Sequence, residues 1–213
     1  MNKKIIILTI ALIVFGLGIS EVTALDNAET NANNILNKNS SNSDVLVVYF
    51  SRTGENYNVG NVEVGNTAMV ASYIKEYLKA DSFEIVPIDK YPDNYDECTK
   101  LASKEKDDNA RPKIANKIDN FDSYNTVFIG YPIWWGDLPM IMYTFLEEYD
   151  FDGKTVIPFN THAGSGDSGT YSTIQEKLPK AKVQTNGFSL DGKTARSDEG
   201  KQKTIEWLKG LGY

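Results

Sequence analysis

The residues best suited to bind a ligand gather in three loops, each of which follows an apolar run typical of a buried strand. The first run, residues 45–50 (VLVVYF), is mostly β-branched or aromatic. Polar and glycine residues follow it, and a helical pattern begins soon afterwards. Hydroxyls, free backbone N–H groups and a helix N-terminus together favour an anion such as a phosphate. The alternative is an ordinary strand–loop–helix with a Ser/Thr cap. The candidate phosphate-binding residues are Ser51, Arg52, Thr53, Gly54, Asn66 and Thr67.

The second loop, YPIWWGD at residues 131–137, places three aromatic side chains directly after another apolar run. A flat aromatic ligand could stack on Tyr131, Trp134 or Trp135. The alternative is a hydrophobic plug beneath a helix N-terminus. Pro132 would stiffen this loop, and Gly136 would allow the backbone to approach a ligand closely.

The third loop, NTHAGSGDSGT at residues 160–170, combines three glycines with hydroxyls and a histidine. Its backbone N–H groups could bind an anion or the polar edge of a ring. We leave two interpretations of His162 open, a contact to the ligand or a loop histidine bonded to the backbone.

Strand-like runs alternate with helical patterns from residue 44 onward. This alternation predicts an α/β fold with a three-layer, doubly wound, five-stranded parallel sheet. In such sheets ligands bind beyond the carboxyl ends of the strands, where all three loops would lie. We expect Ser197 to cap the last helix. The predicted strands are 45–50, 83–87, 126–131, 155–160 and 182–188, and the predicted helices are 67–80, 94–106, 138–148, 171–178 and 198–208.

Together, the motifs YFSRTG…GNT, YPIWWG and THAGSG resemble those of the flavodoxin family over residues 44–210. The resemblance implies strand order 2-1-3-4-5 and a non-covalently bound FMN at the switch point. The six candidate residues of the first loop would surround the phosphate, with Arg52 facing either the phosphate or solvent and a partner. The ring system would lie against Pro132, Ile133, Trp134, Trp135 and Gly136, and its other edge against Thr161, His162, Ala163, Gly164, Ser165 and Gly166.

One segment departs from the family pattern. Residues 55–65 (ENYNVGNVEVG) interrupt a phosphate loop that is usually short. Residues 51–54 must therefore meet Asn66 and Thr67 in space for the predicted phosphate site to exist.

The resemblance implies electron transfer through FMN, with no catalytic side chain. Asp137 or Asp167 would repel an anionic reduced flavin and lower its potential. The alternatives are an FMN-dependent NAD(P)H:quinone-type reductase, although no GxGxxG follows a strand, and a non-redox extracellular flavin-binding module. The net charge of −7 argues against a nucleic-acid partner and suits a basic redox protein, while a quinone is a possible small acceptor. The single cysteine and single histidine exclude a disulfide within the chain and a multi-histidine metal centre.

The N-terminus carries the features of an exported protein. Lys3 and Lys4 precede an uncharged apolar run at residues 5–19, and small residues near Ala24 suit a signal peptidase. Residues 1–24 are predicted to be a signal peptide or an uncleaved membrane anchor, in which case residues 5–19 would tether the protein to the outer face of the membrane. Residues 25–43 are a predicted Asn/Ser-rich linker, and residues 44–213 are the predicted folded domain.

Overall fold

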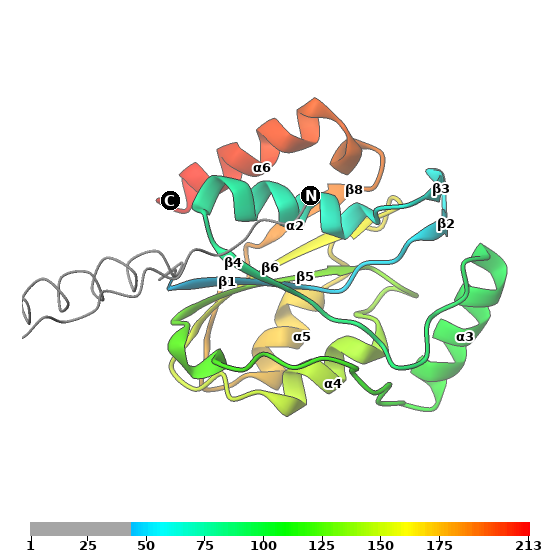
Figure 1. Ribbon diagram of the computed structural model, residues 1–213, viewed down its shortest axis with the longest axis horizontal. Helices are drawn as coiled ribbons and strands as arrows, with labels where there is room; N and C mark the ends of the chain where they lie inside the picture. Colours follow the sequence, from blue (N-terminus) through cyan, green and yellow to red (C-terminus); the bar gives the residue numbers. More distant parts are fainter. Residues whose placement is uncertain (1–43) are drawn as a thin grey trace, which may run out of the picture. The chain divides into compact units, whose positions relative to one another are not determined.

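The computed structural model describes residues 44–213 as a parallel sheet with helices on both faces (Figure 1). The predicted signal peptide or anchor (1–24) and linker (25–43) lie outside the described residues. Between residues 44 and 213, no helix is both long and apolar enough to cross a membrane.

The sheet has the predicted strand order. β4 (Asp81–Glu84) pairs with β1 (Val45–Tyr49), which pairs with β5 (Thr126–Pro132), which pairs with β6 (Thr155–His162), all in parallel. The fifth position is shared by two short strands, β7 (Lys182–Val183) and β8 (Phe188–Asp191), and both pair with β6. The order 2-1-3-4-5 is therefore confirmed, with six strands in five positions.

The prediction of one continuous fifth strand at 182–188 was wrong, and Pro158 in β6 gives a physical reason. The carbonyls of Lys154, just before β6, and of Val156 accept hydrogen bonds from the N–H groups of Lys182 and Gln184, so alternate positions along this segment face β7. Pro158 is next in that row and has no N–H to donate, so the ladder breaks there. Pairing resumes at Phe188, opposite Phe159.

Helices cover both faces of the sheet, and a further helix lies beyond the sheet edge (Figure 1). α2 (Asn66–Leu78) and α6 (Asp198–Gly210) form the first layer, and α4 (Met140–Glu148) and α5 (Thr170–Lys177) form the second. α3 (Tyr95–Asp107) lies beside the carboxyl ends of the strands. The five predicted helices are confirmed to within two residues at each end. Ser197 caps α6, accepting the N–H of Gly200 at 3.2 Å.

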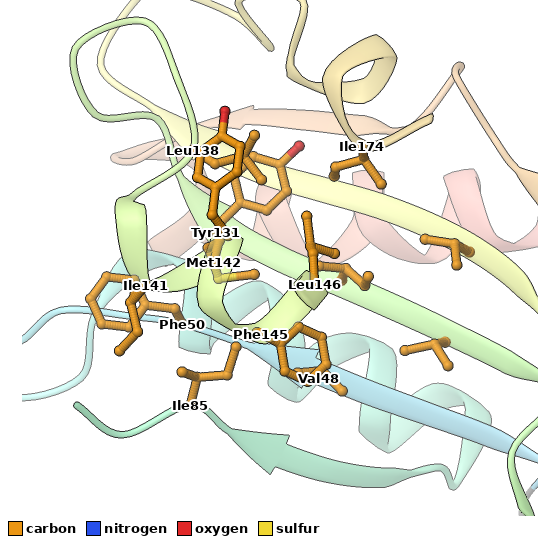
Figure 2. Close-up of a cluster of buried hydrophobic side chains, with 14 of the residues drawn as sticks. Val48, Phe50, Ile85, Tyr131, Leu138, Ile141, Met142, Phe145, Leu146 and Ile174 are labelled. Atoms are coloured by element: carbon orange, nitrogen blue, oxygen red, sulfur yellow. The ribbon is translucent and has the colours of Figure 1, made fainter. Parts of the chain in front are cut away.

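The core has two parts because β1 is buried on both faces. Leu46 and Val48 belong to the cluster beneath α4 and α5, and Val47 belongs to the cluster beneath α2 and α6. Figure 2 shows side chains of the first cluster, with Phe145 and Met142 of α4 among those from the sheet. This two-sided burial explains why residues 45–50 are apolar without alternation.

The interrupting segment folds as a hairpin. β2 (Gly54–Asn56) pairs with β3 (Gly60–Val62) in an antiparallel two-stranded sheet of its own. The hairpin projects from the carboxyl end of β1, on the same side of the domain as α3 (Figure 1). The hairpin and α3 therefore flank the sheet edge where the ligand is predicted to bind.

Candidate functional site

The three predicted loops border one cavity of about 370 Å³ at the carboxyl ends of β1, β5 and β6. Eleven residues named from the sequence line it: Ser51, Arg52, Asn66, Thr67, Pro132, Ile133, Trp134, Trp135, Thr161, His162 and Ala163. Seven predicted residues lie outside its lining: Thr53, Gly54, Tyr131, Gly136, Gly164, Ser165 and Gly166. Six further lining residues were missed: Asn56, Tyr57, Tyr95, Cys98, Thr99 and Ala102.

The two halves of the predicted phosphate loop meet. Ser51 Oγ accepts the N–H of Ala68 at 3.0 Å, so Ser51 caps α2 from across the hairpin. Gly65 makes this closure possible, because a Cβ built there would lie 2.3 Å from Ser51 Oγ and 2.4 Å from the carbonyl oxygen of Arg52. Its φ of −69° is open to any residue, so the requirement for glycine here comes from close approach.

A buried hydroxyl pair joins the first loop to the third. Thr67 Oγ1 and Thr161 Oγ1 lie 2.8 Å apart, and both residues are almost fully buried. Asn66, the neighbour of Thr67, also lines the cavity. Its Oδ1 accepts a hydrogen bond from Arg196 Nη1 at 3.4 Å. Arg196 lies in the 3₁₀ helix η2 (Thr194–Arg196), far from the three motifs in the sequence.

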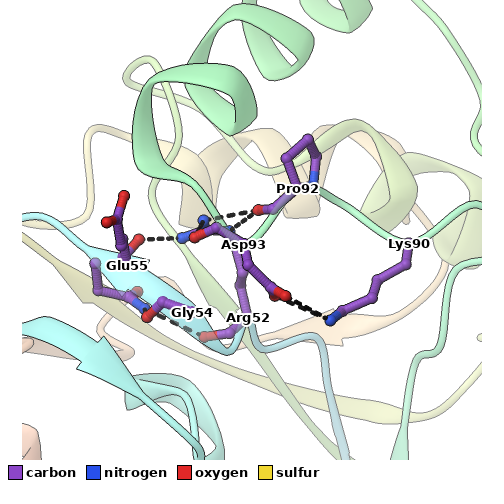
Figure 3. A network of polar contacts seen from close by, with 7 residues as sticks. Arg52, Gly54, Glu55, Lys90, Pro92 and Asp93 are labelled. Carbon is purple, nitrogen blue, oxygen red and sulfur yellow. Dashed lines mark hydrogen bonds and ion pairs between the residues drawn. The ribbon is translucent and has the colours of Figure 1, made fainter.

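The predicted phosphate contact of Arg52 does not match its hydrogen bonds. Its guanidinium donates to the carbonyl oxygen of Pro92 from Nε (3.0 Å) and Nη2 (2.8 Å), to that of Asp93 from Nη2 (2.7 Å), and to that of Glu55 from Nη1 (Figure 3). Gly54 is also structural, because a Cβ there would lie 2.6 Å from the carbonyl oxygen of Asp93. Arg52 and Gly54 therefore hold the hairpin against the loop that precedes α3.

The hairpin also fixes the start of α3. Glu55 Oε2 accepts the backbone N–H of Tyr95 at 2.9 Å and Asn94 Nδ2 at 3.0 Å. This anchoring places one face of α3 along the cavity and accounts for four of the missed lining residues. The sequence signal was present but weak: Cys98 and Ala102 form a buried i, i+4 pair on an otherwise charged helix.

Cys98, the single cysteine, is buried in the cavity wall. Burial raises the pKa of its thiol, with Arg52 acting in the opposite direction. The thiol form therefore predominates, and a reactive thiolate is disfavoured.

The aromatic loop is a tight turn that separates its two tryptophans. Trp134 and Asp137 exchange two backbone hydrogen bonds of 3.0 Å, and Trp135 and Gly136 between them have φ of 51° and 71°, as in a type I′ turn. The turn therefore gives Gly136 a structural role, and close approach of its backbone to a ligand stays a prediction. Trp134 packs edge-on against Phe50 at 5.5 Å between ring centroids.

Trp135 is the exposed tryptophan of the loop, with 59% of its surface accessible. Its Nε1–H donates to the carbonyl oxygen of Thr99 at 2.9 Å, which fixes the indole at the cavity wall. The expectation that Tyr131 could stack on a ligand was wrong, because Tyr131 is fully buried and its hydroxyl bonds Thr170 at 2.9 Å.

In the third loop only the first residues reach the cavity. His162 lines it, and its Nδ1 accepts the N–H of Gly164 at 2.9 Å. The backbone-bonded interpretation is therefore confirmed, and a contact to the ligand stays a prediction. Because Nδ1 accepts, the neutral imidazole has its N–H at Nε2. Gly164 and Gly166 have φ of 111° and 64°, so they are required for the course of the loop. Asn160, fully buried, donates to the carbonyl oxygen of Gly166 at 3.2 Å and holds the loop in place.

Neither carboxylate expected to tune a ligand's charge lines the cavity. Asp137 Oδ1 accepts the hydroxyl of Tyr143 and the N–H of Leu138, each at 2.8 Å. Burial first, and then this hydrogen bond, raise the pKa of Tyr143. Asp167 Oδ2 accepts the N–H of Gly169 at 3.1 Å. Among residues 44–213, no group of three or more metal-ligating side chains occurs.

The family model described as flavodoxin matches residues 44–210 of the chain. Candidate flavoproteins from Bacteroides eggerthii and Bacteroides uniformis have similar structures, with TM-scores of 0.63 and 0.62 at 29% and 30% identity. These matches cover 79% and 78% of this chain and 98% and 97% of theirs. A flavoprotein from Lactobacillus acidophilus, whose crystal structure contains FMN, has a TM-score of 0.55 at 21% identity, over 70% of this chain and 94% of its own. No curated protein matches the chain.

Proposed function

The chain belongs to the flavodoxin family, and on that basis we propose that it binds FMN non-covalently and transfers electrons through it. The observation that carries the proposal is one cavity with two chemically different ends. Hydroxyl and amide groups at the start of α2 line one end, and aromatic and aliphatic side chains line the other. FMN has the same division, with a phosphate at one end and a flat ring system at the other.

The polar end fits a phosphate through neutral donors. Ser51 Oγ accepts the N–H of Ala68, which leaves its own O–H free to donate. The first N–H groups of α2, at Asn66 and Thr67, have no partner within the helix and favour an anion. The hydroxyl of Thr67 is bonded to Thr161, so the main contribution of Thr67 would be its backbone N–H.

The aromatic end fits a planar ring. Ile133, Trp134 and Trp135 supply one wall, and α3 supplies another with Tyr95 and Ala102. Trp135 is held by its bond to Thr99, so little side-chain entropy remains to be lost when a ring stacks there. The Nε2–H of His162 would be a donor for a polar edge of the ring.

When bound, FMN would supply one- or two-electron transfer, and the protein would supply its position and surroundings. The FMN complex of the Lactobacillus acidophilus protein supports this choice of cofactor. The polar end of the cavity supports it independently, because a flavin without a phosphate would leave those donors unused.

We further propose an exported electron carrier that docks to a basic redox protein. The net charge of −7 favours such a partner. The basic and apolar segments at residues 3–19 favour export, with the domain released or tethered outside the cytoplasmic membrane.

The redox role is tested with the full-length protein loaded with FMN under anaerobic conditions. Dithionite, NADH or NADPH is mixed with it, with and without a quinone, and flavin absorption is followed in a stopped-flow instrument. A carrier is reduced by dithionite and shows no rapid turnover of NAD(P)H and quinone. Rapid turnover of NAD(P)H and quinone would show that the protein is a reductase and not an electron carrier. If dithionite leaves the spectrum of the bound flavin unchanged, both redox functions are contradicted.

A further inference from the structure

We infer that Arg196 is a positioning residue that orients the Asn66 amide toward the flavin phosphate, and that this pair makes the site prefer FMN to riboflavin. The inference rests on the proposed function and adds the residues that select the phosphate. Arg196 belongs to none of the three loop motifs and does not line the cavity itself.

Arg196 contacts the backbone and side chain of the segment that closes the phosphate loop. Its Nη1 donates to the carbonyl oxygen of Val64 at 2.6 Å and to Asn66 Oδ1 at 3.4 Å. Because a cation faces Oδ1, the amide presents its Nδ2 donor elsewhere. Asn66 lines the cavity at its polar end, where that donor suits a phosphate oxygen.

The nitrogen of the Asn66 amide packs against the backbone of Gly192. A Cβ built on Gly192, just after β8, would lie 2.7 Å from Asn66 Nδ2 and 3.4 Å from Cγ2 of Val59. Gly192 is itself fixed, because its N–H donates to the carbonyl oxygen of His162 at 2.9 Å. The amide is therefore held between a guanidinium and a close-packed glycine, which limits its rotation.

The charges near the polar end support a role for Arg196 rather than Arg52. The hydrogen bonds of Arg52 all go to backbone carbonyls of the hairpin and the loop before α3. In the described part of the chain, Nε and Nη2 of Arg196 have no hydrogen-bond partner. Arg196, unlike Arg52, therefore hydrogen-bonds a residue that lines the polar end, and it acts on a bound phosphate through Asn66.

The test compares two ligands that differ only in the phosphate. Dissociation constants for FMN and riboflavin are measured by flavin fluorescence for the full-length wild type and for R196Q, G192A, N66A and R196Q/N66A. Gly192→Ala displaces the amide and leaves the charge intact. Lys193→Gln is the matched control, because it removes an exposed cation from the same segment. Thermal melts confirm that each variant is folded, and R196K serves in place of R196Q if the latter unfolds.

We expect R196Q and G192A each to weaken FMN binding about tenfold, the loss typical of a hydrogen bond to a charged group, with riboflavin affinity changed less than about twofold. R196Q should add little in the N66A background, since Arg196 acts through Asn66. Equal losses for both flavins, or additive losses in the double variant, would overturn the inference and leave FMN binding intact. Wild-type protein that binds no FMN would instead overturn the proposed function and this inference together.

Discussion

Gly65→Ala tests whether closure of the interrupted loop creates the phosphate site. The glycine lies where residues 51–54 meet the start of α2. An added Cβ would lie 2.3 Å from Ser51 Oγ and 2.4 Å from the carbonyl oxygen of Arg52. Contacts this short do not occur between real atoms, and the second is to backbone, so one of the two segments must shift.

The expected magnitude follows from those contacts. Overpacking of this kind costs about 1–3 kcal/mol of folding stability. The shift also lengthens the 3.0 Å bond from the N–H of Ala68 to Ser51 Oγ, which is worth about 1 kcal/mol as a helix cap. If the misaligned donors weaken the binding free energy of the FMN phosphate by a similar amount, FMN affinity falls about tenfold.

The assay is flavin fluorescence titration with a thermal melt, and two glycines give matched controls. Gly210→Ala adds a methyl group at the end of α6, where nothing lies within 4 Å. Gly60→Ala perturbs the hairpin through its φ of 93°, also with nothing within 4 Å. We expect FMN affinity close to wild type for both. A Gly65→Ala protein with wild-type stability and wild-type FMN affinity would refute the idea that close approach here forms the site.

Three further changes separate structural roles from binding roles. Arg52→Met should lower the free energy of unfolding by about 1–2 kcal/mol, because three carbonyls lose their donor, and urea unfolding measures this; unchanged stability with lost FMN affinity would restore Arg52 as a phosphate ligand. Glu105→Gln should make the free energy of unfolding depend less on pH. Burial raises the pKa of Glu105, so the folded state keeps the proton of this carboxyl at a higher pH than the unfolded state does. The free energy of unfolding of the wild type therefore falls as the pH rises above the ordinary carboxyl range. Glutamine keeps the acceptor for Tyr91, and an identical slope in urea unfolding at several pH values would contradict this reasoning. Gly130→Ala should cost about 2–3 kcal/mol in the same assay, because its Cβ would lie 2.1 Å from the ring of Phe159; a wild-type unfolding midpoint would contradict that packing.

Much of the fold could be predicted from the sequence because the order of apolar and polar residues follows which positions are buried. The apolar run at residues 45–50 is buried on both faces of the sheet, and such runs mark parallel strands whatever else surrounds them. The helices could be placed from their apolar spacing and from caps such as Ser197. The three loops could be brought to one edge by topology alone, since the carboxyl ends of parallel strands face the same way.

The remaining features depend on contacts between distant segments. The break in the fifth strand arises from Pro158 in the neighbouring strand, and within residues 182–188 only the turn-forming pair Asn186-Gly187 marks it. Arg52 looked like a phosphate ligand because its neighbours are polar, but the carbonyl oxygens that bind it come from Glu55 and from residues 92–93. Arg196 reaches Asn66 only because β8 ends beside α2. In each case the deciding atom is remote in sequence, so local pattern could not identify it.

The central claim is that the cavity at the carboxyl ends of the strands binds FMN. The most direct measurement is a titration of FMN with the purified full-length protein, followed by absorption and fluorescence. We predict quenched fluorescence and shifted flavin bands that saturate at one FMN per chain, with a dissociation constant in the micromolar range or below. Unchanged fluorescence and absorption throughout that range would contradict the account.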